Sequence, residues 1–440
     1  MNQSASTYDV IAGHNSDVQA RLYTPAHQGR VHAGAYLSQE MYQYDVPFLT
    51  RPRTEHVEKH FSQLYGTEHT FWLTGGGSQG VLTACALLGT QYRKVAIALN
   101  SHISTVNGII LAGLEPYFIP SQTLMPTTEE IITALETTGV SALLLTHPSY
   151  EGITVDLAQL SDYCRQHDIA LVVDEAHGSH FPFLDGPWPS AIAIHADIVT
   201  HSLHKYTGSL VQTAMLHLPM GSRFTVEQVM GVIPLFEATT RSNLLLLSIE
   251  DAIKRGYSEK GKALFAQAIG ECNRLRDQLE QYGQVLTYDP DVKDPLKIFL
   301  KSDRVLGTEL ADILVDLGLD GEFANEEGVL LLFSFNHSPE DFEFIQKSLA
   351  MAVPILEAKT VQTPFPCDYF SRRPQMKVLP NQAFFSQKEK LPLNQSLGRI
   401  SGGCIKKIPP GSPILVPGEE VTTWHLNRLP PEMTVDVVKE

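Results

Sequence analysis

Short, wholly apolar runs alternate with amphipathic stretches through the first half of the chain, and no other feature restricts the possible fold as strongly. The strand-like runs are HTFWLT (69–74), KVAIALN (94–100), EPYFIP (115–120), SALLLT (141–146) and IALVVDEAH (169–177). Helix-like stretches lie between them, at 81–89, 104–113, 127–138 and 156–168. Apolar strands separated by helices are typical of a parallel sheet that is covered on both faces. The alternation therefore predicts an α/β fold with a mostly parallel central sheet.

The rest of the chain extends this sheet and then begins a smaller α/β pattern. ADIVTHSLHK (196–205) and QTAMLHL (212–218) read as further strands of the first sheet. A second set of strand-like and helix-like stretches follows between residues 297 and 353. We place a domain boundary near residue 290. Residues 1–290 then form an N-terminal segment with the major domain, and residues 291–440 form a smaller α/β C-terminal domain.

The charge of the chain excludes some classes of partner. Its 440 residues include 33 Lys and Arg against 49 Asp and Glu, which gives a formal net charge of −16. A surface this acidic repels polyphosphates, so we expect neither nucleic acid nor anionic lipid as a partner. No apolar run approaches the roughly 18–20 residues that a membrane-spanning helix needs. The charge favours, weakly, a cationic small molecule.

The cysteines indicate the compartment. Five of them are widely scattered, and no CxxC pair is present, so neither a disulfide framework nor a cysteine zinc site is expected. The first twenty residues show no basic segment followed by an apolar one, as a secretory signal would. We therefore expect a protein of a reducing compartment, the cytoplasm.

A glycine-rich turn follows the first strand of the alternating region. Residues 75–80, GGGSQG, satisfy the GxGxxG pattern of a dinucleotide-binding turn between a strand and a helix. That pattern also requires an acidic residue about 20 positions on, and the next strand ends in Leu99-Asn100-Ser101 instead. NAD binding is therefore disfavoured. A helix N-terminus with Ser78 in its first turn still suits a phosphate group, although a plain glycine turn explains the residues too.

Two further patterns suggest ATP hydrolysis, but the residues around them and the net charge of the chain argue against it. Asp174-Glu175-Ala176-His177 spells a DEAH box, and residues 256–262 nearly spell a P-loop. Ala263 stands where the P-loop needs a Ser or Thr for Mg²⁺. The acidic net charge also disagrees with a motor that acts on nucleic acid.

Asp174 fits better with Lys205 than with a DEAH box. Each follows an apolar strand, and Lys205 has His201 and His204 as near neighbours in HSLHK. Pyridoxal phosphate chemistry needs a lysine of lowered pKa that forms a Schiff base and a carboxylate that keeps the pyridine nitrogen protonated. It also needs a phosphate site, which Ser78 and Ser202 can supply, and a flat side chain over the ring, for which His102 is the candidate. Residues after four strands thus meet at one crevice of an α/β sheet.

These residues resemble the ornithine/lysine/arginine decarboxylases of fold type I. The similarity lies in five segments, VVDEAHGSHF (172–181), THSLHKYTGSLVQTAMLHL (200–218), THPSYEGITVDL (146–157), GRISGGCIKKIPPGSPILVPGEE (398–420) and PAHQG (25–29). The resemblance implies a fold of the pyridoxal-phosphate-dependent transferase type, with residues 1–290 holding the cofactor. It also implies a short form without the receiver-like domain of the large members. Its implied activity is decarboxylation of arginine, lysine or ornithine in polyamine biosynthesis by a homodimer or an assembly of dimers.

The resemblance assigns a role to each candidate residue. Lys205 would hold the cofactor covalently, and Asp174 would pair with the pyridinium. His102 would stack on the ring, with Ala176 beneath it and His177 near the ring hydroxyl. Phosphate ligands would be Ser78, Ser202 and His204. The family's phosphate turn usually reads NGTS, so GGGS places Gly77 where a hydroxyl is common and removes one donor.

Four alternatives stay open at this point. The shared Schiff-base residues also suit an aminotransferase or another lyase, and a scaffold that has lost its cofactor would keep the same fold. Histidines at 177, 180, 201 and 204 could suggest a metal site, but metal-binding sets usually include supported carboxylates, so we predict none. Tyr150 and Thr146 either end a strand or contact cofactor or substrate.

Overall fold

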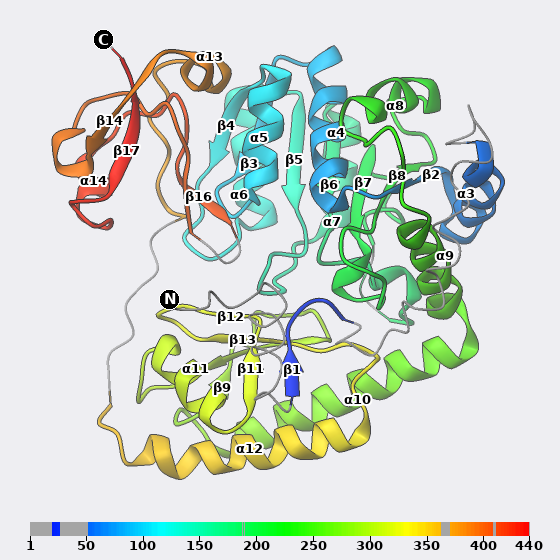
Figure 1. Cartoon of the computed structure of the whole chain (residues 1–440), viewed down its shortest axis with the longest axis vertical. Coiled ribbons are helices and arrows are strands. Elements are labelled where there is room, and N and C mark those ends of the chain that lie inside the picture. Colours follow the sequence, from blue (N-terminus) through cyan, green and yellow to red (C-terminus); the bar gives the residue numbers. More distant parts are fainter. Residues whose placement is uncertain are drawn as a thin grey trace, which may run out of the picture.

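The computed structural model describes residues 20–26, 52–186, 188, 190–361, 370–407 and 411–439. Within the motifs named above, residues 27–29 of PAHQG and residues 408–410 of the C-terminal segment lie outside the described residues. Three groups of strands make up the structure, and they occupy different places in the molecule (Figure 1).

A seven-stranded sheet forms the centre of the largest part. Its strand order is β2-β8-β7-β6-β5-β3-β4. The bounds are β2 Thr67–Leu73, β3 Lys94–Ala98, β4 Glu115–Ile119, β5 Ala142–Thr146, β6 Ala170–Asp174, β7 Ile198–Ser202 and β8 Ala214–Pro219. The pairs among β4, β3, β5, β6 and β7 are parallel, whereas β8 pairs antiparallel with both β7 and β2. The predicted mostly parallel sheet is confirmed, and β8 runs in the opposite direction after the short connection that carries Lys205.

Helices cover both faces of this sheet, which explains why its central strands β3, β5 and β6 are apolar over nearly their whole length. On one face pack α4 (Gly76–Gln91), α5 (Ile103–Ala112) and α8 (Val226–Val232), and on the other α3 (Pro52–Tyr65), α6 (Thr128–Thr138) and α7 (Leu157–Gln166). Successive residues of β6 alternate between these two cores: Leu171 and Val173 enter one, and Ala170 and Val172 the other. Strand residues that point alternately to two buried faces must all be apolar.

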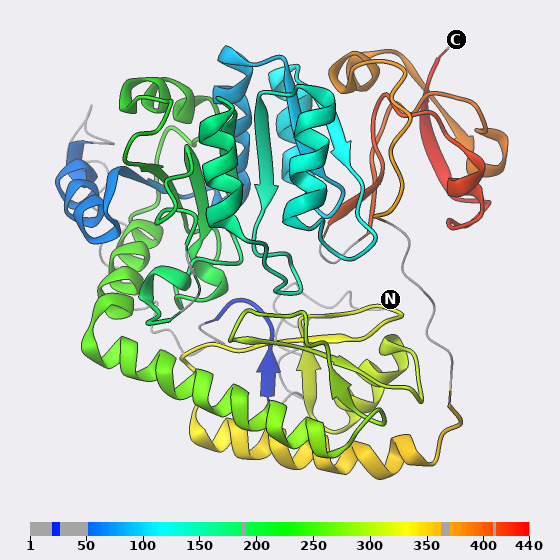
Figure 2. The same cartoon turned by 180° about the vertical axis from the view of Figure 1, so that it is seen from behind.

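A second layer lies against the edge of the large sheet where the strands end (Figures 1 and 2). Its four-stranded sheet has the order β12-β13-β10-β9, with β9 Thr287–Tyr288, β10 Lys297–Lys301, β12 Phe323–Ala324 and β13 Val329–Leu332. Beside it, β1 (Ala20–Leu22) pairs in parallel with β11 (Leu319–Gly321). The helices of this layer are α10 (Glu259–Gln281), α11 (Gly307–Asp316) and α12 (Pro339–Glu357), of which α10 and α12 run along its outer side. The helix before α10, α9 (Asn243–Tyr257), lies beside the large part and contacts α3 through Tyr257 and Tyr65.

The C-terminal residues form a third group beside α5. Two hairpin-like pairs make it up, β14 (Lys388–Pro392) with β17 (Thr434–Val438) and β15 (Ile405–Lys407) with β16 (Ser412–Leu415). The short helices α13 (Pro380–Phe385) and α14 (Thr423–Leu426) accompany them, and Val416 joins the core that contains α5. Residues 291–440 are thus divided between two places, and the boundary near residue 290 stays a prediction. In the part of the chain that the structure describes, no helix is both long and apolar enough to cross a bilayer.

The packing of α4 on β7 depends on a glycine. A Cβ atom at Gly80 would lie 2.5 Å from Thr200 Cγ2 and 3.3 Å from Leu73 Cδ1. We expect Gly80→Ala to lower the free energy of unfolding by roughly 1–3 kcal/mol, because overpacking a close helix–strand contact forces the backbone apart. The matched control is Gly270→Ala in α10, where no atom lies within 4 Å of the added Cβ. At that position the change should raise the free energy of unfolding by up to about 1 kcal/mol. Urea unfolding of both variants checks this, and equal stability would contradict the packing argument.

Candidate active site

A cavity of about 380 Å³ opens at the carboxyl ends of the strands, and residues of the large sheet and Glu322 of the second layer line it. All nine residues that the sequence singled out line it, namely Gly77, Ser78, His102, Asp174, Ala176, His177, Ser202, His204 and Lys205. The carboxyl ends of β3, β5, β6 and β7 lead into this cavity, as does the N-terminus of α4. The structure therefore brings all nine residues together at one cavity, and their roles in binding and catalysis stay predictions.

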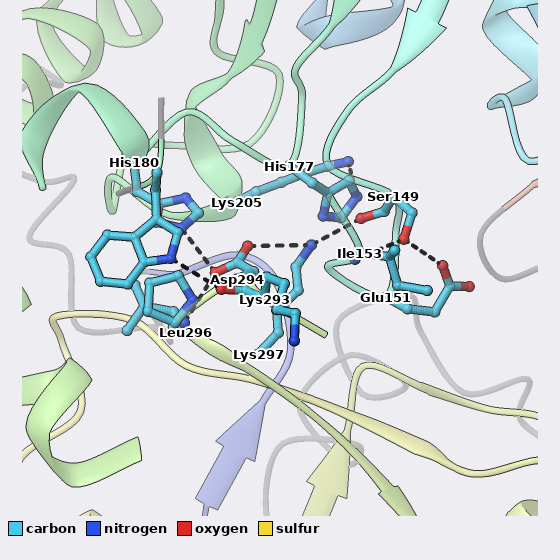
Figure 3. Close-up of polar contacts among 12 residues, drawn as sticks. Ser149, Glu151, Ile153, His177, His180, Lys205, Lys293, Asp294, Leu296 and Lys297 are labelled. Carbon is cyan, nitrogen blue, oxygen red and sulfur yellow. Dashed lines mark hydrogen bonds and ion pairs between the residues drawn. The ribbon is translucent and has the colours of Figure 1, made fainter. Parts of the chain in front are cut away.

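Lys205 and His177 form the closest polar pair in the cavity. The Lys205 Nζ atom lies 2.6 Å from His177 Nε2 (Figure 3). Burial lowers the pKa of Lys205 to about 8, although the Asp174 and Glu322 carboxylates oppose the change. Burial and the neighbouring Lys205 cation hold the pKa of His177 well below its usual range. A lowered pKa increases the fraction of the lysine that is neutral and nucleophilic near physiological pH, and a neutral imidazole can accept its proton.

Asp174 is the last residue of β6, and its position is fixed by the backbone on both sides. Its Oδ1 atom accepts a hydrogen bond of 3.2 Å from the Ala176 N–H, and its carbonyl oxygen accepts one of 3.0 Å from the His147 N–H. Burial raises the pKa of this carboxyl, while the Lys205 cation opposes the change. A buried carboxylate needs a cationic partner. Asp174 is therefore suited to hold a protonated ring nitrogen.

The N-terminus of α4 presents backbone N–H groups to the same cavity. The N–H of its N-cap residue, Gly75, donates to Gln79 Oε1 at 2.8 Å, and that of Gly76, whose φ of +73° favours glycine, donates to the Gln212 carbonyl oxygen at 2.8 Å. A Cβ atom at Gly77 would lie 3.4 Å from Ser202 Cβ, so the glycine leaves open the space between the turn and β7. Ser202 Oγ is 3.3 Å from His204 Nδ1. The next N–H groups of this sixteen-residue helix, those of Gly77 and Ser78, with hydroxyl and imidazole groups beside them, suit a phosphate.

His102 is held in place by the helix that it caps. Its Nδ1 accepts a hydrogen bond of 3.2 Å from the Ser104 N–H and lies 2.8 Å from Ser104 Oγ. Burial, with the cations of Lys205 and Lys406, lowers the pKa of His102 to about 4. A Cβ atom at Gly411 would lie 3.3 Å from the ring, so the third strand group also reaches this side chain. A neutral, fixed imidazole of this kind can stack on an aromatic cofactor.

Unpaired polar atoms indicate that the cavity receives a polar ligand. Both side-chain polar atoms of Asn100, the hydroxyl of Thr146 and Nδ1 of His177 are buried without a hydrogen-bond partner among the described residues. Such groups are costly unless something binds them. Together with the phosphate-type turn, the carboxylate and the lysine, they match the functional groups of pyridoxal phosphate. The residues present fit this cofactor.

The sequence did not indicate Glu322, which reaches the cavity from the second layer, between β11 and β12. Its Oε1 accepts a hydrogen bond of 2.7 Å from the Tyr150 hydroxyl, and its Oε2 accepts one of 2.7 Å from the Thr24 N–H. Tyr150, which the sequence left undecided, also packs edge-on against His177, with ring centroids 4.6 Å apart. Glu322 follows no strand of the large sheet, so no pattern in the sequence pointed to it.

His180, His201 and Glu175 of the DEAH segment form hydrogen bonds inside the protein and do not line the cavity. Glu175 accepts hydrogen bonds from Ser190 Oγ at 2.5 Å and from the Ala191 N–H at 2.7 Å, and its Oε2 is 2.6 Å from His201 Nε2. His201 Nδ1 in turn lies 3.0 Å from His217 Nε2. His180 pairs with Asp294. Among the described residues, no three or more His, Cys, Asp or Glu side chains gather as a metal site would require.

Comparison with known proteins decides the family. The model of the Orn/Lys/Arg decarboxylase major domain matches residues 49–303, more than half of the chain. The chain belongs to the Orn/Lys/Arg decarboxylase family. It is an amino-acid decarboxylase, and its cofactor is pyridoxal phosphate. The DEAH segment, residues 174–177, therefore belongs to a decarboxylase and not to an ATPase.

Individual relatives agree with the family. The chain is 28% identical to the arginine decarboxylase of Halalkalibacterium halodurans over 389 residues, covering 83% of this chain and 78% of that protein. It is 27% identical to the arginine decarboxylase of Bacillus subtilis over 387 residues, covering 84% and 79%.

Solved structures confirm the fold. The lysine decarboxylase LdcF of Francisella novicida matches with a TM-score of 0.70 at 18% identity, over 88% of this chain and 72% of that one. The serine palmitoyltransferase of Sphingomonas wittichii matches with a TM-score of 0.61 at 17% identity, over 77% and 88%. The predicted fold type I is thus confirmed.

Proposed function

We propose that this decarboxylase acts on a basic amino acid (arginine, lysine or ornithine) and releases the corresponding amine. One observation carries the proposal. The cavity that holds the Lys205–His177 pair and Asp174 has a second carboxylate, Glu322, contributed by the second layer. A carboxylate in addition to the one suited to the cofactor ring fits a substrate with a distal cation. The names of the curated relatives support the same class of substrate.

Different residues of this chain would bind the cofactor and transfer the proton. Pyridoxal phosphate, when bound, supplies an electron sink for the pair left behind as the bond to the carboxyl group breaks. Lys205 would hold the cofactor, Asp174 would keep its ring nitrogen protonated, and His102 would cover its face. The N-terminus of α4 with Ser78, Ser202 and His204 would bind its phosphate.

Lys205 and His177 then control the proton that must reach Cα. Their nitrogen atoms are 2.6 Å apart, so a proton can pass between them without a large movement. His177 is buried and Lys205 is partly buried, and removal from water favours the neutral form of each. The protonated pair therefore releases its proton readily.

Glu322 should determine the affinity for the substrate. We expect Glu322→Gln to raise KM for the basic amino acid by about 10- to 100-fold, because a buried charge-assisted hydrogen bond is worth roughly 1.5–3 kcal/mol. The affinity for pyridoxal phosphate should change much less, since the cofactor-binding side chains belong to the large sheet. Steady-state kinetics and a cofactor titration check both statements. An unchanged KM would mean that another group binds the distal cation.

The reaction type can be tested by identifying the products. The purified protein is incubated with pyridoxal phosphate and each of the three amino acids, and the products are separated by chromatography and identified by mass. Putrescine, cadaverine or agmatine supports the proposal. A keto acid formed without an amine would show that the protein is an aminotransferase instead.

We further propose that the protein is a homodimer or an assembly of dimers in the cytoplasm, where its product enters polyamine synthesis. The family assignment supports the dimer, and four free thiols among the described residues, Cys85, Cys164, Cys272 and Cys404, agree with a reducing compartment. Light scattering of the purified protein tests the assembly. A monomer of 48.7 kDa would contradict it.

A further inference from the structure

A fully buried lysine, which the proposed function does not use, lies behind the active site. Lys297 is the first residue of β10 in the second layer, and its side chain has no exposed surface. Its Nζ atom lies 3.6 Å from Asp294 Oδ2 and 3.2 Å from the carbonyl oxygen of Ser149 (Figure 3). Removing an ammonium group from water costs several kcal/mol, so a surface position would be the default for this side chain.

Asp294 joins this lysine to the turn that carries His177. His180 lies three residues after His177 and is also fully buried, and its Nε2 is 3.1 Å from Asp294 Oδ1. The His180 ring stacks on Tyr206, with ring centroids 3.9 Å apart and planes inclined by 26°. Since Tyr206 directly follows Lys205, the contacts of Asp294 reach the chain on both sides of the Lys205–His177 pair.

The turn after β5 packs on the same ion pair. A Cβ atom at Gly152 would lie 2.8 Å from Lys297 Cδ and 2.9 Å from Asp294 Cβ, and Gly152 has a φ of +104°. Its carbonyl oxygen accepts hydrogen bonds of 3.0 Å from the N–H groups of Lys293 and Asp294. This turn contains Tyr150, which binds Glu322 in the cavity. Three segments that form the cavity wall therefore converge on two charged residues of the second layer.

We propose that Lys297 and Asp294 are positioning residues, which fix the Lys205–His177 pair and the Tyr150 turn relative to each other. They contact the backbone and side chains that carry the active-site groups, and neither lines the cavity. The proposal rests on the proposed role of Lys205. It predicts that the buried ion pair controls how the site binds its cofactor, in addition to any contribution to folding.

The charge of Lys297 also acts on the site. Together with burial, it lowers the pKa of Lys205, of His177 and of the buried His147. The other charged or titratable groups that face Lys205 are Asp174, Glu322, His177 and His102. Loss of the Lys297 charge should therefore raise the pH at which Lys205 becomes a nucleophile.

The test measures how the full-length chain, stripped of cofactor, binds added pyridoxal phosphate, which is followed by its visible absorbance between pH 6 and 10. For Lys297→Met we expect an affinity that is lower by about tenfold or more, a typical loss when a supporting partner is removed. The pH midpoint of the association rate should rise by about half a unit or more. The matched control is Lys301→Met on the same strand, since Lys301 pairs with Asp289 at 2.5 Å and does not line the cavity. Its cofactor affinity and its pH midpoint should equal those of the wild-type protein.

A double variant separates positioning from folding. Asp294→Asn with Lys297→Met removes both charges and leaves neither ion without a partner, so its thermal unfolding should stay close to that of the Lys301→Met control. We expect its cofactor affinity to remain about tenfold low. Recovery of both stability and affinity in the double variant would overturn the proposal, as would a Lys297→Met protein that binds like the control. If the unchanged protein did not bind pyridoxal phosphate at all, the proposed role of Lys205 would itself be wrong.

Discussion

Lys205→Ala is expected to abolish the visible absorbance of the bound cofactor and to reduce decarboxylation by roughly 10³-fold or more. The variant loses the nucleophile that holds the cofactor and one half of the proton-donating pair. Positioned proton transfer alone contributes about 10²- to 10⁴-fold to a reaction rate. The absorbance spectrum with added pyridoxal phosphate, and amine production at saturating substrate, check the two expectations.

Two controls make this result specific. Lys205→Arg keeps a positive charge next to His177 but cannot form the covalent link to the cofactor. It should therefore be as inactive as the alanine variant. Lys347→Ala changes an exposed lysine of α12 that pairs with Glu343, and it should leave the spectrum and the rate unchanged. A Lys205→Ala protein with a normal absorbance band would show that another lysine holds the cofactor.

Asp174→Asn should give the second largest loss, about 10²- to 10³-fold in kcat. The asparagine has nearly the same shape but no charge, so it cannot stabilise a protonated ring nitrogen, and removing one electrostatic group of this kind costs about 2.7–4 kcal/mol of transition-state stabilisation. The measurement is kcat with saturating cofactor and substrate, so that weaker cofactor binding does not enter the result.

The neighbouring carboxylate provides the matched control for Asp174. Glu175 lies in the same turn and is equally buried, but it binds Ser190, Ala191 and His201 and does not line the cavity. Glu175→Gln should therefore lower the unfolding temperature and change kcat by less than about tenfold, since it removes structural hydrogen bonds alone. Equal kcat losses in the two variants would contradict the assignment of Asp174 to the cofactor.

The sequence predicted the large sheet well because its central strands are buried on both faces. Wholly apolar runs such as residues 142–146 have few alternatives to a central parallel strand. Asp174 and Lys205 were found for a related reason. Polar residues that directly follow such strands have to meet at one edge of the sheet.

The contributions of the second layer could not be predicted in this way. Glu322 and Lys297 reach the site through the packing of one layer on another, which no local pattern encodes. His180 and His201 looked like members of a histidine cluster, yet their rings turn toward Asp294 and Glu175. Residues 291–440 read as one C-terminal domain because the sequence does not reveal that their strands pack in two separate places.

Release of CO₂ from carboxyl-labelled arginine, lysine and ornithine tests the central claim most directly. With pyridoxal phosphate present, the unchanged protein should release labelled CO₂ from at least one of the three, in equal amounts with the amine, and Lys205→Ala should release none above background. If the cofactor-loaded protein released no CO₂ from any of the three, or if Lys205→Ala released it at the same rate, the assignment of this cavity as a basic amino-acid decarboxylase site would be contradicted.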